Sequence, residues 1–357
     1  MNFLFKTKQR SPHDLVRSMR DAMMRLGVVE TGPDTLVLRD APSSEVRRKQ
    51  GEELHAGIQQ AKHLLYGEGG QEPVPEQVAQ LAQDVYQMHL IQYLLVYLPR
   101  LEFEARKDVV QIFAALLQRK IGTRLPTVEY IAANPVIVIL TLRGYADADI
   151  ALNTGMMLHE LLQHEALAKI LLYSDDFYRF PEYIDTTSFG ISCDAFANFR
   201  ETLVRHRAVT AEYLEQHYER VCQMLTQFFA MYNQLLDSSN YVTKRQSLKL
   251  LGGLLVDRAN YNTMLRYVAD ENNLKRIMNL FRDRSRNIQL ETFHVFKVFV
   301  ANPKKTPAVE AILQRNRSRL LAFLSDFQRD RTDESFIDER QYVMQIIAAL
   351  PASSKGA

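Results

Sequence analysis

The stretch NYVTKRQSLKLLGGLLVDR, Asn240 to Arg258, carries the pattern of a single amphipathic helix. Leu248, Leu251 and Leu255 recur at i, i+3 and i+7, which places them on one side of a helix that faces a core. Asn240 precedes the first turn, and its side chain can accept hydrogen bonds from the unpaired N–H groups there. The stretch therefore predicts a helix with a defined start, one packed side and one free side.

Two adjacent glycines, Gly252 and Gly253, lie inside this helical pattern. Each costs about 1 kcal/mol relative to alanine in a helix interior. We therefore expect either a bend at this point or a close approach by a neighbouring helix.

Amphipathic segments of the same kind recur along the chain. They begin at Asp108, Ile150, Ile191, Val242 and Ile288, at steps of 42, 41, 51 and 46 residues. Helical armadillo and HEAT repeats have periods of about 40 to 47 residues. No segment alternates between apolar and polar residues for long enough to require a sheet. The sequence therefore predicts an all-α fold, a solenoid of divergent armadillo- or HEAT-like helical repeats with essentially no strand.

The chain divides into four predicted regions. Gly32, Pro33 and Pro42 interrupt the helical pattern after the first helix, so we interpret that part as a loop. The regions are 1–26, an N-terminal basic arm and a capping helix; 27–52, an inserted loop expected to be partly disordered; 53–328, the helical-repeat solenoid; and 329–357, a charged C-terminal segment with a last helix and a frayed tail.

The charges are nearly balanced, because 44 Lys and Arg against 42 Asp and Glu give a formal net charge of +2. A surface that binds nucleic acid or an anionic membrane needs a large basic excess, so we expect neither partner. The longest apolar run, Pro135–Leu142, is far short of the ~20 residues that cross a membrane, and MNFLFKTKQR lacks the features of a secretory signal. The two cysteines, Cys193 and Cys222, have no CxxC spacing and indicate a reducing compartment, so a cytoplasmic location is expected.

Recognised motifs for catalysis or metal binding are missing from the sequence. HELLQH, His159–His164, places its histidines five apart, about 140° around a helix, whereas the zinc motif HExxH places them four apart on one face. DADIALNTG, which starts at Asp147, has Ala151 and Leu152 where a calcium loop needs an oxygen ligand and a glycine. We therefore expect no enzyme activity, no metal and no cofactor.

Tyr241, Arg245 and Lys249 recur every four residues and share a side of the helix away from the leucines. We call these three residues the stripe. Protein interfaces are enriched in Tyr and Arg, so the stripe is a candidate binding surface, and a solvated charged face is the alternative. Phe189, in TTSFGIS, is either an exposed aromatic at a helix start or a core residue. Met278, in NLKRIMNLF, is either a buried gap filler or a recognition residue.

Other basic residues on the later helices join the stripe in a wider basic surface. They are Lys275, Arg276, Arg282, Arg284, Arg286 and Lys297. Taken one at a time, each is interpreted as part of a solvated charged face.

Segments along the whole chain resemble one protein family. They are, in order, SPHDLVRSMRDAM, QLAQDVYQ, FEARKDVVQIF, IGTRLPTVEYI, HEALAKILL, DAFANFRETLVRH, AEYLEQHYERV, NYVTKRQSLKLL, MNLFRDRSRNIQ and FHVFKVFVANP. Together they resemble the Mo-twenty-five scaffold family, also called calcium-binding protein thirty-nine and, in fungi, Hym-type proteins. The resemblance runs from Ser11 to about Gln328.

The resemblance implies a curved, right-handed solenoid without catalytic activity. Its concave face would bind a germinal-centre-type protein kinase or pseudokinase in an active-like conformation. In animals the family completes a trimer with a pseudokinase and a tumour-suppressor kinase, and the fungal branch serves a cell-separation and polarity kinase network. By residue match, the resemblance implies concave-face contacts at Phe189, Tyr241, Arg245 and Lys249. It also implies that Met278 belongs to a pocket for a short Trp-Glu-Phe peptide at the partner's C-terminus.

The sequence departs from the family pattern in three places. The region around Thr31–Ser44 is inserted, which favours the fungal branch. Gly190 and Gly253 stand where the family is expected to have acidic residues, and the chain contains no Trp. The family name does not imply calcium binding here, because the sequence holds no calcium loop.

Two other functional classes fit the sequence less well than a kinase-activating scaffold. An armadillo-type peptide-binding adaptor, as in nuclear import, presents a Trp and Asn array to a basic peptide, whereas this chain has no Trp and its stripe is basic. Repeat-based RNA reading needs the same base-reading positions in every repeat, and the aligned helices carry no such code. The scaffold is therefore the favoured hypothesis, with the general peptide-binding adaptor as the alternative.

Overall fold

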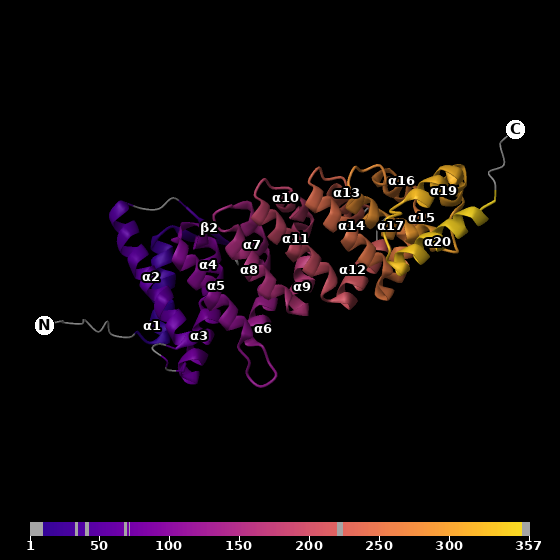
Figure 1. Ribbon diagram of the computed structural model, residues 1–357. Coiled ribbons are helices and arrows are strands. Elements are labelled where there is room, and N and C mark those ends of the chain that lie inside the picture. Colours follow the sequence, from indigo (N-terminus) through magenta and orange to yellow (C-terminus); the bar gives the residue numbers. More distant parts are fainter. Residues whose placement is uncertain are drawn as a thin grey trace. The chain divides into compact units, whose positions relative to one another are not determined.

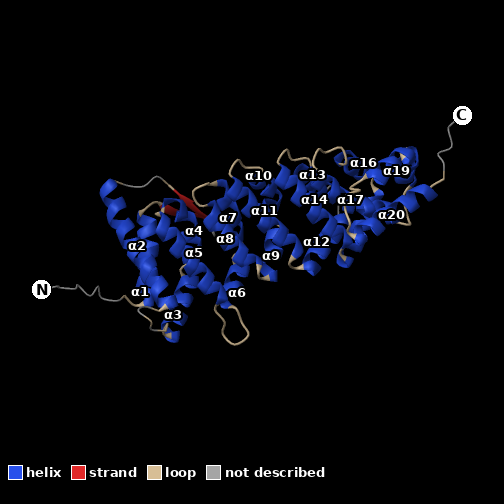
Figure 2. Cartoon of the chain, viewed as in Figure 1, coloured by secondary structure: helices blue, strands red, loops and turns tan. Residues whose placement is uncertain are grey.

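The computed structural model describes residues 10–32, 35–39, 43–67, 70, 72–219 and 224–351. The predicted basic arm at 1–9, Cys222, and residues 352–357 of the predicted tail lie outside these ranges. Helices form most of the described chain, and a single pair of short strands lies near its start (Figure 2). The prediction of an all-α, helical-repeat fold is confirmed.

The chain separates into two compact units, Met1–His206 and Arg207–Ala357. The elements of the first unit follow one another in chain order (Figure 1) as α1 (Pro12–Arg25), β1 (Val28–Gly32), β2 (Thr35–Leu38), α2 (Ser44–Tyr66), α3 (Pro75–Gln87), α4 (Leu90–Tyr97), η1 (Leu98–Arg100), α5 (Phe103–Gln118), α6 (Pro126–Ala133), α7 (Val136–Arg143), η2 (Gly144–Ala146), α8 (Ala151–Leu162), α9 (Glu165–Leu172), η3 (Asp175–Arg179), α10 (Phe180–Ile184) and α11 (Phe189–Val204). The second unit comprises α12 (Arg207–Glu219), α13 (Met224–Leu236), α14 (Tyr241–Val256), η4 (Arg258–Asn260), α15 (Tyr261–Ala269), α16 (Glu271–Leu280), α17 (Arg286–Ala301), α18 (Pro307–Arg315), α19 (Arg317–Asp326) and α20 (Glu334–Ala349). The solenoid predicted as one region, 53–328, therefore spans parts of both units.

Within each unit, every third helix lies beside its counterpart in the next repeat. In the first unit α2, α5, α8 and α11 contact one another in succession, and in the second unit α14, α17 and α20 do the same. Each repeat thus contributes three helices, as in armadillo-like proteins, and neighbouring repeats bury each other's apolar sides. The outer side of such a row is built from equivalent positions on successive helices.

Helix α14 forms as the sequence pattern indicates. The side-chain oxygen of Asn240 accepts hydrogen bonds from the backbone N–H groups of Val242 and Thr243, at 2.9 and 3.3 Å. Leu248, Leu251 and Leu255 are all buried. The predicted start and packed side of this helix are therefore confirmed.

The two glycines of α14 do not mark a close helix approach. A Cβ atom added at Gly252 would lie 3.8 Å from Val295 of α17, an ordinary van der Waals separation, and one added at Gly253 would meet no atom within 4 Å. The helix also continues through both positions without a break. The expectation of a close approach is therefore wrong, since a larger side chain fits at either position.

The region predicted as a loop, 27–52, contains regular structure. β1 and β2 pair antiparallel, with Val28 opposite Leu38, and α2 begins at Ser44 and not at Glu53. Strands of five and four residues alternate over too few positions to reveal a period of two. The buried Val28 holds the hairpin against the rest of the unit, where β1 contacts α1 and α4.

A polar cluster ties the hairpin to two helices. Glu30 of β1 accepts hydrogen bonds from the Tyr93 hydroxyl of α4, at 2.5 Å, and from the Arg20 guanidinium of α1, at 2.8 Å. The guanidinium also lies over the Tyr93 ring, 5.3 Å from its centroid. These two donors lower the pKa of the Glu30 carboxyl, Tyr93 more than Arg20. The ionised carboxylate is therefore the form that the folded unit favours.

We predict that Glu30→Gln weakens the pH dependence of stability in acid. Because the folded pKa is lowered, ionised Glu30 stabilises the fold above the unfolded pKa of about 4.3, and this contribution disappears as the pH falls through the folded pKa. Glu30 is half exposed, so the effect at pH 7 is expected to stay below about 1 kcal/mol. Melting curves of both proteins at pH 7 and about pH 3.5 measure it. Parallel declines in melting temperature would contradict the prediction.

The C-terminal segment is integrated into the second unit more than the predicted region 329–357 indicates. Helix α20 begins at Glu334, and its Phe336, Val343 and Ile347 are buried. It contacts α17 and α19, so it completes the row of α14 and α17. The many charged residues around Phe336 in the sequence make the apolar side of this helix hard to recognise from the sequence.

Candidate functional site

The stripe lies along the outer side of α14, with one residue on each turn. Tyr241 is 44% exposed, the Arg245 side chain is 40% exposed, and Lys249 is also exposed. The leucines of the same helix face the core. The structure thus brings Tyr241, Arg245 and Lys249 together on one accessible surface of the second unit.

Helix α17 holds the first residue of the stripe. The Asn287 side-chain amide donates a hydrogen bond to the Tyr241 hydroxyl oxygen, at 3.1 Å. This bond, with smaller contributions from Ser285 and the positive charge of Arg245, lowers the pKa of the Tyr241 phenol. The tyrosine is therefore oriented before any partner arrives, and the surroundings of its oxygen favour negative charge.

Helix α17 also orients Arg245, the second residue of the stripe. Glu291 Oε1 lies 3.5 Å from Nε of Arg245, and the Glu291 side chain is only 12% exposed. Asn287 follows Tyr241 by 46 residues, and Glu291 follows Arg245 by the same step. In the part of the chain that the structure describes, no carboxylate pairs with Lys249. The stripe therefore combines two oriented side chains with one cation that no carboxylate neutralises.

Phe189 belongs to the first unit and is described there. It is the first residue of α11 and is 69% exposed, so it is not a core residue. The adjacent helix α8 carries two more exposed apolar side chains, Leu152 and Met156, one turn apart. A Cβ atom at the neighbouring Gly190 would meet no atom within 4 Å, so the position also has room for an acidic side chain.

Met278 lies on α16 and is half-buried. Leu274 and Ile277 of the same helix are buried and fix its orientation. The thioether is thus neither a fully buried core filler nor a freely exposed side chain. The assignment of Met278 to a peptide pocket stays a prediction.

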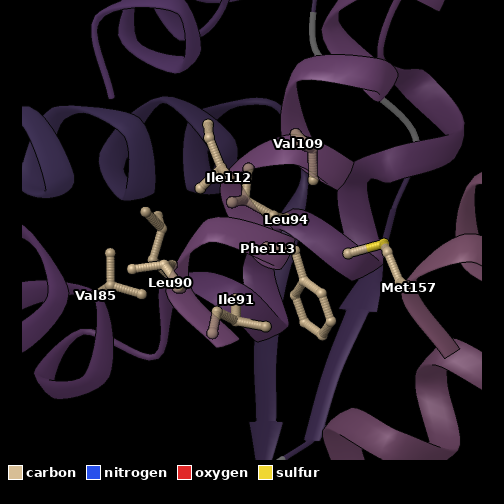
Figure 3. A pocket seen from close by; sticks show the side chains of 9 residues that line it. Val85, Leu90, Ile91, Leu94, Val109, Ile112, Phe113 and Met157 are labelled. Atoms are coloured by element: carbon tan, nitrogen blue, oxygen red, sulfur yellow. The ribbon is translucent and has the colours of Figure 1, made fainter. Parts of the chain in front are cut away.

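A hollow in the first unit belongs to the core and is not a ligand site. Its volume is about 10 Å³, the lower limit for a single water molecule. Its lining is entirely apolar (Figure 3), from Val85, Leu90, Ile91, Leu94, Val109, Ile112, Phe113, Leu116 and Met157. Such a space stays dry, because a water inside it would find no hydrogen-bond partner.

Metal ligands do not gather anywhere in the described ranges. Among these residues no group of three or more His, Cys, Asp and Glu side chains could hold a metal ion. The described helices also include none whose length and apolar character would let it cross a bilayer.

Sequence reasoning missed four residues of these surfaces, Asn287, Glu291, Leu152 and Met156. The first two could have been found from the repeat, because the 46-residue step from Val242 to Ile288 carries Tyr241 onto Asn287 and Arg245 onto Glu291. Leu152 and Met156 are exposed residues of α8 and lie four residues apart. Apolar residues at that spacing, away from the buried positions, indicate a second apolar side of the helix.

The helices and the succession of similar three-helix repeats define the class of protein, an all-α helical-repeat protein. A model of the family described as Mo25-like matches residues 3–351. Calcium-binding protein 39-like from Mus musculus is 44% identical over 348 residues, 97% of each chain. MO25-like protein 2 from Caenorhabditis elegans is 46% identical over 348 residues, 97% of this chain and 98% of that one. Conidiophore development protein hymA from Emericella nidulans is 38% identical over 381 residues, 98% of this chain and 94% of that one.

The chain therefore belongs to the Mo25-like family, and the resemblance drawn from the sequence is confirmed.

Proposed function

We propose that the protein is a non-catalytic cytoplasmic scaffold that binds and activates a germinal-centre-type protein kinase or pseudokinase. The observation that carries this proposal is the exposed stripe on α14, whose Tyr241 and Arg245 are oriented by Asn287 and Glu291. Oriented Tyr and Arg side chains are typical centres of protein interfaces, because little conformational freedom is lost on binding. Phe189 on the first unit supplies a second, aromatic contact to the same partner.

Activation needs no chemistry from the scaffold. A surface that binds the active arrangement of a kinase more tightly than the inactive one shifts the population toward the active state. Moving that population from 1:99 to 99:1 requires a difference in binding free energy of about 5.5 kcal/mol. The name of the Emericella nidulans relative refers to conidiophore development, which supports a role in a polarity and cell-separation network.

The second contact in the proposal is a Trp-Glu-Phe-like peptide at the partner's C-terminus, bound beside Met278. Two separate contacts on one partner act together, because the first binding event raises the effective concentration of the second. Loss of either contact alone then leaves measurable binding.

We predict that Arg245→Ala weakens binding of the partner kinase about thirtyfold, roughly 2 kcal/mol, as expected for a central interface arginine. Met278→Ala is expected to weaken it through the peptide contact, and the double variant is expected to lose it. The kinase is first identified by affinity capture with this chain and mass spectrometry. It is then titrated against the wild type, the two single variants and the double variant.

The matched control is Arg319→Ala, which removes an exposed arginine from α19, a helix that does not carry the stripe. Its affinity should equal that of the wild type. Melting curves run in parallel should shift little for Arg245→Ala, since a half-exposed ion pair contributes less than about 1 kcal/mol. Unchanged affinity in the double variant would reject the site assignment.

A further inference from the structure

A second surface of the second unit is hollowed and basic. The hollow has a volume of about 550 Å³, within the range of roughly 300 to 1,000 Å³ that is typical of small-molecule sites. Its walls come from the end of α13, the first turn of α14, helix α16 and the turn that follows α16. All lining residues except Leu280 are polar: Asp237, Lys244, Asn272, Lys275, Arg276, Asn279, Arg282 and Asp283. We call this the basic hollow.

Both carboxylates of the basic hollow are already engaged by protein donors. Asp237 pairs with Arg276, and Oδ2 of Asp283 lies 3.2 Å from Nζ of Lys244. Asp283 also accepts a hydrogen bond from the backbone N–H of Ser285, at 2.9 Å. These pairs consume two of the four cations that line the hollow.

The two remaining cations give the basic hollow a net positive charge. Among the described residues Lys275 pairs with Glu271 of its own helix, at 3.2 Å; this carboxylate does not line the hollow and offsets part of the lysine charge, and both side chains are substantially exposed. Arg282 is exposed and has no carboxylate partner among the residues that the structure describes. The amides of Asn272 and Asn279 add uncharged donors along the same side of α16. A ligand in this space would therefore meet several N–H donors from different elements.

We propose that the basic hollow binds a small ligand that carries several phosphate groups, such as an inositol polyphosphate, either free or as the headgroup of a lipid. Guanidinium and ammonium groups bind phosphate oxygens through short, charge-assisted hydrogen bonds. A ligand with several phosphates offers an anionic group to both Arg282 and Lys275, which line the same hollow. An extended polyanion such as nucleic acid would need a continuous basic surface, which the formal net charge of +2 does not favour.

This proposal can be tested apart from the kinase-binding proposal, although Met278 lies on the same helix, three residues after Lys275 and four before Arg282. The residues that line the basic hollow include neither the stripe nor Met278. Variants of the hollow can therefore be tested without any kinase present.

The test compares two charge reversals that lie two residues apart. Arg282→Glu changes the lining of the basic hollow, and Arg284→Glu makes the same change at an exposed arginine outside the lining. The probes are myo-inositol hexakisphosphate by isothermal titration calorimetry, and vesicles of phosphatidylcholine with or without phosphatidylinositol 4,5-bisphosphate by co-sedimentation. Melting curves with and without hexakisphosphate give a second readout, because a ligand that binds only the folded state raises the melting temperature.

The proposal expects saturable one-to-one binding that falls at least tenfold in Arg282→Glu and less than twofold in Arg284→Glu. Binding of hexakisphosphate alone identifies a soluble ligand, and binding of the phosphoinositide vesicles alone identifies a lipid headgroup. Both results support the proposal. Should Arg282→Glu fail to fold, Arg282→Gln is expected to weaken binding in the same direction.

Two outcomes would overturn it. One is no binding to either probe, whether or not a phosphorylated peptide binds in their place. The other is an equal loss in the two charge reversals, which would reveal attraction to net charge alone.

Discussion

Replacing Phe293 by alanine is expected to lower the free energy of unfolding of the second unit by about 3 to 5 kcal/mol. Phe293 is fully buried on α17, and its ring centroid lies 5.7 Å from that of Phe327 and 5.4 Å from that of Phe336. The substitution leaves a cavity where three aromatic rings meet, and the surrounding helices cannot close it fully. Urea unfolding followed by circular dichroism measures the loss.

The control for this prediction is Tyr342→Ala on α20. Tyr342 is about as large as Phe293 but is exposed, so its removal should change the free energy of unfolding by less than about 0.5 kcal/mol. If Phe293→Ala lost less than about 1 kcal/mol, the aromatic cluster would not be what holds α20 against α17.

The second large effect is expected at Gly155 of α8. A Cβ atom there would lie 1.9 Å from Oδ2 of Asp194 and 2.8 Å from the Tyr145 hydroxyl oxygen. That oxygen donates its proton to Asp194 at 2.5 Å and accepts a hydrogen bond from the Asn198 amide at 2.7 Å. The amide also donates to the Gly155 carbonyl, at 2.9 Å. A methyl group at Gly155 would therefore displace a network that joins α8 to α11.

We predict that Gly155→Ala lowers the free energy of unfolding by about 3 kcal/mol. Overpacking costs about 1 to 3 kcal/mol and each lost buried hydrogen bond about 1 kcal/mol, and these losses outweigh a gain in helix propensity of up to about 1 kcal/mol. The same substitution at Gly253 of α14 is the control, because its added methyl meets nothing within 4 Å. Gly253→Ala should stabilise the protein by up to about 1 kcal/mol through helix propensity alone. Melting temperatures that moved the same way in both variants would contradict this pair of predictions.

The features of the fold that could be predicted are those that depend on residues close together in the sequence. The leucine spacing and Asn240 define α14, because a helix needs only its own sequence to set its period and its start. The hairpin was not predictable, because Val28 is buried only once α1 and α4 are in place. The predicted close approach at the glycines of α14 was wrong for the same reason. The open space beside Gly253 depends on neighbouring helices, which the sequence of α14 does not specify.

The candidate site divides in a similar way. The spacing of Tyr241, Arg245 and Lys249 predicted that they share one side of a helix, and the structure places them there. The stripe as a binding surface came from its pairing of Tyr with Arg and from the family resemblance, and it stays a proposal. Asn287 and Glu291 lie on another helix, so the pattern of α14 by itself does not indicate them; only the 46-residue step between the two repeats does. The basic hollow was harder still, because segments on either side of α15 form it.

The shared 46-residue step between α14 and α17 has a consequence for insertions and deletions in the gene. One residue added inside α14 after Tyr241 would rotate every later side chain of that helix by about 100°. Arg245 would then turn away from Glu291, and Leu248 would leave the core. One residue added in the turn between α16 and α17 would leave the period of both helices intact. Changes of length that keep the stripe in register are therefore confined to the connections between helices.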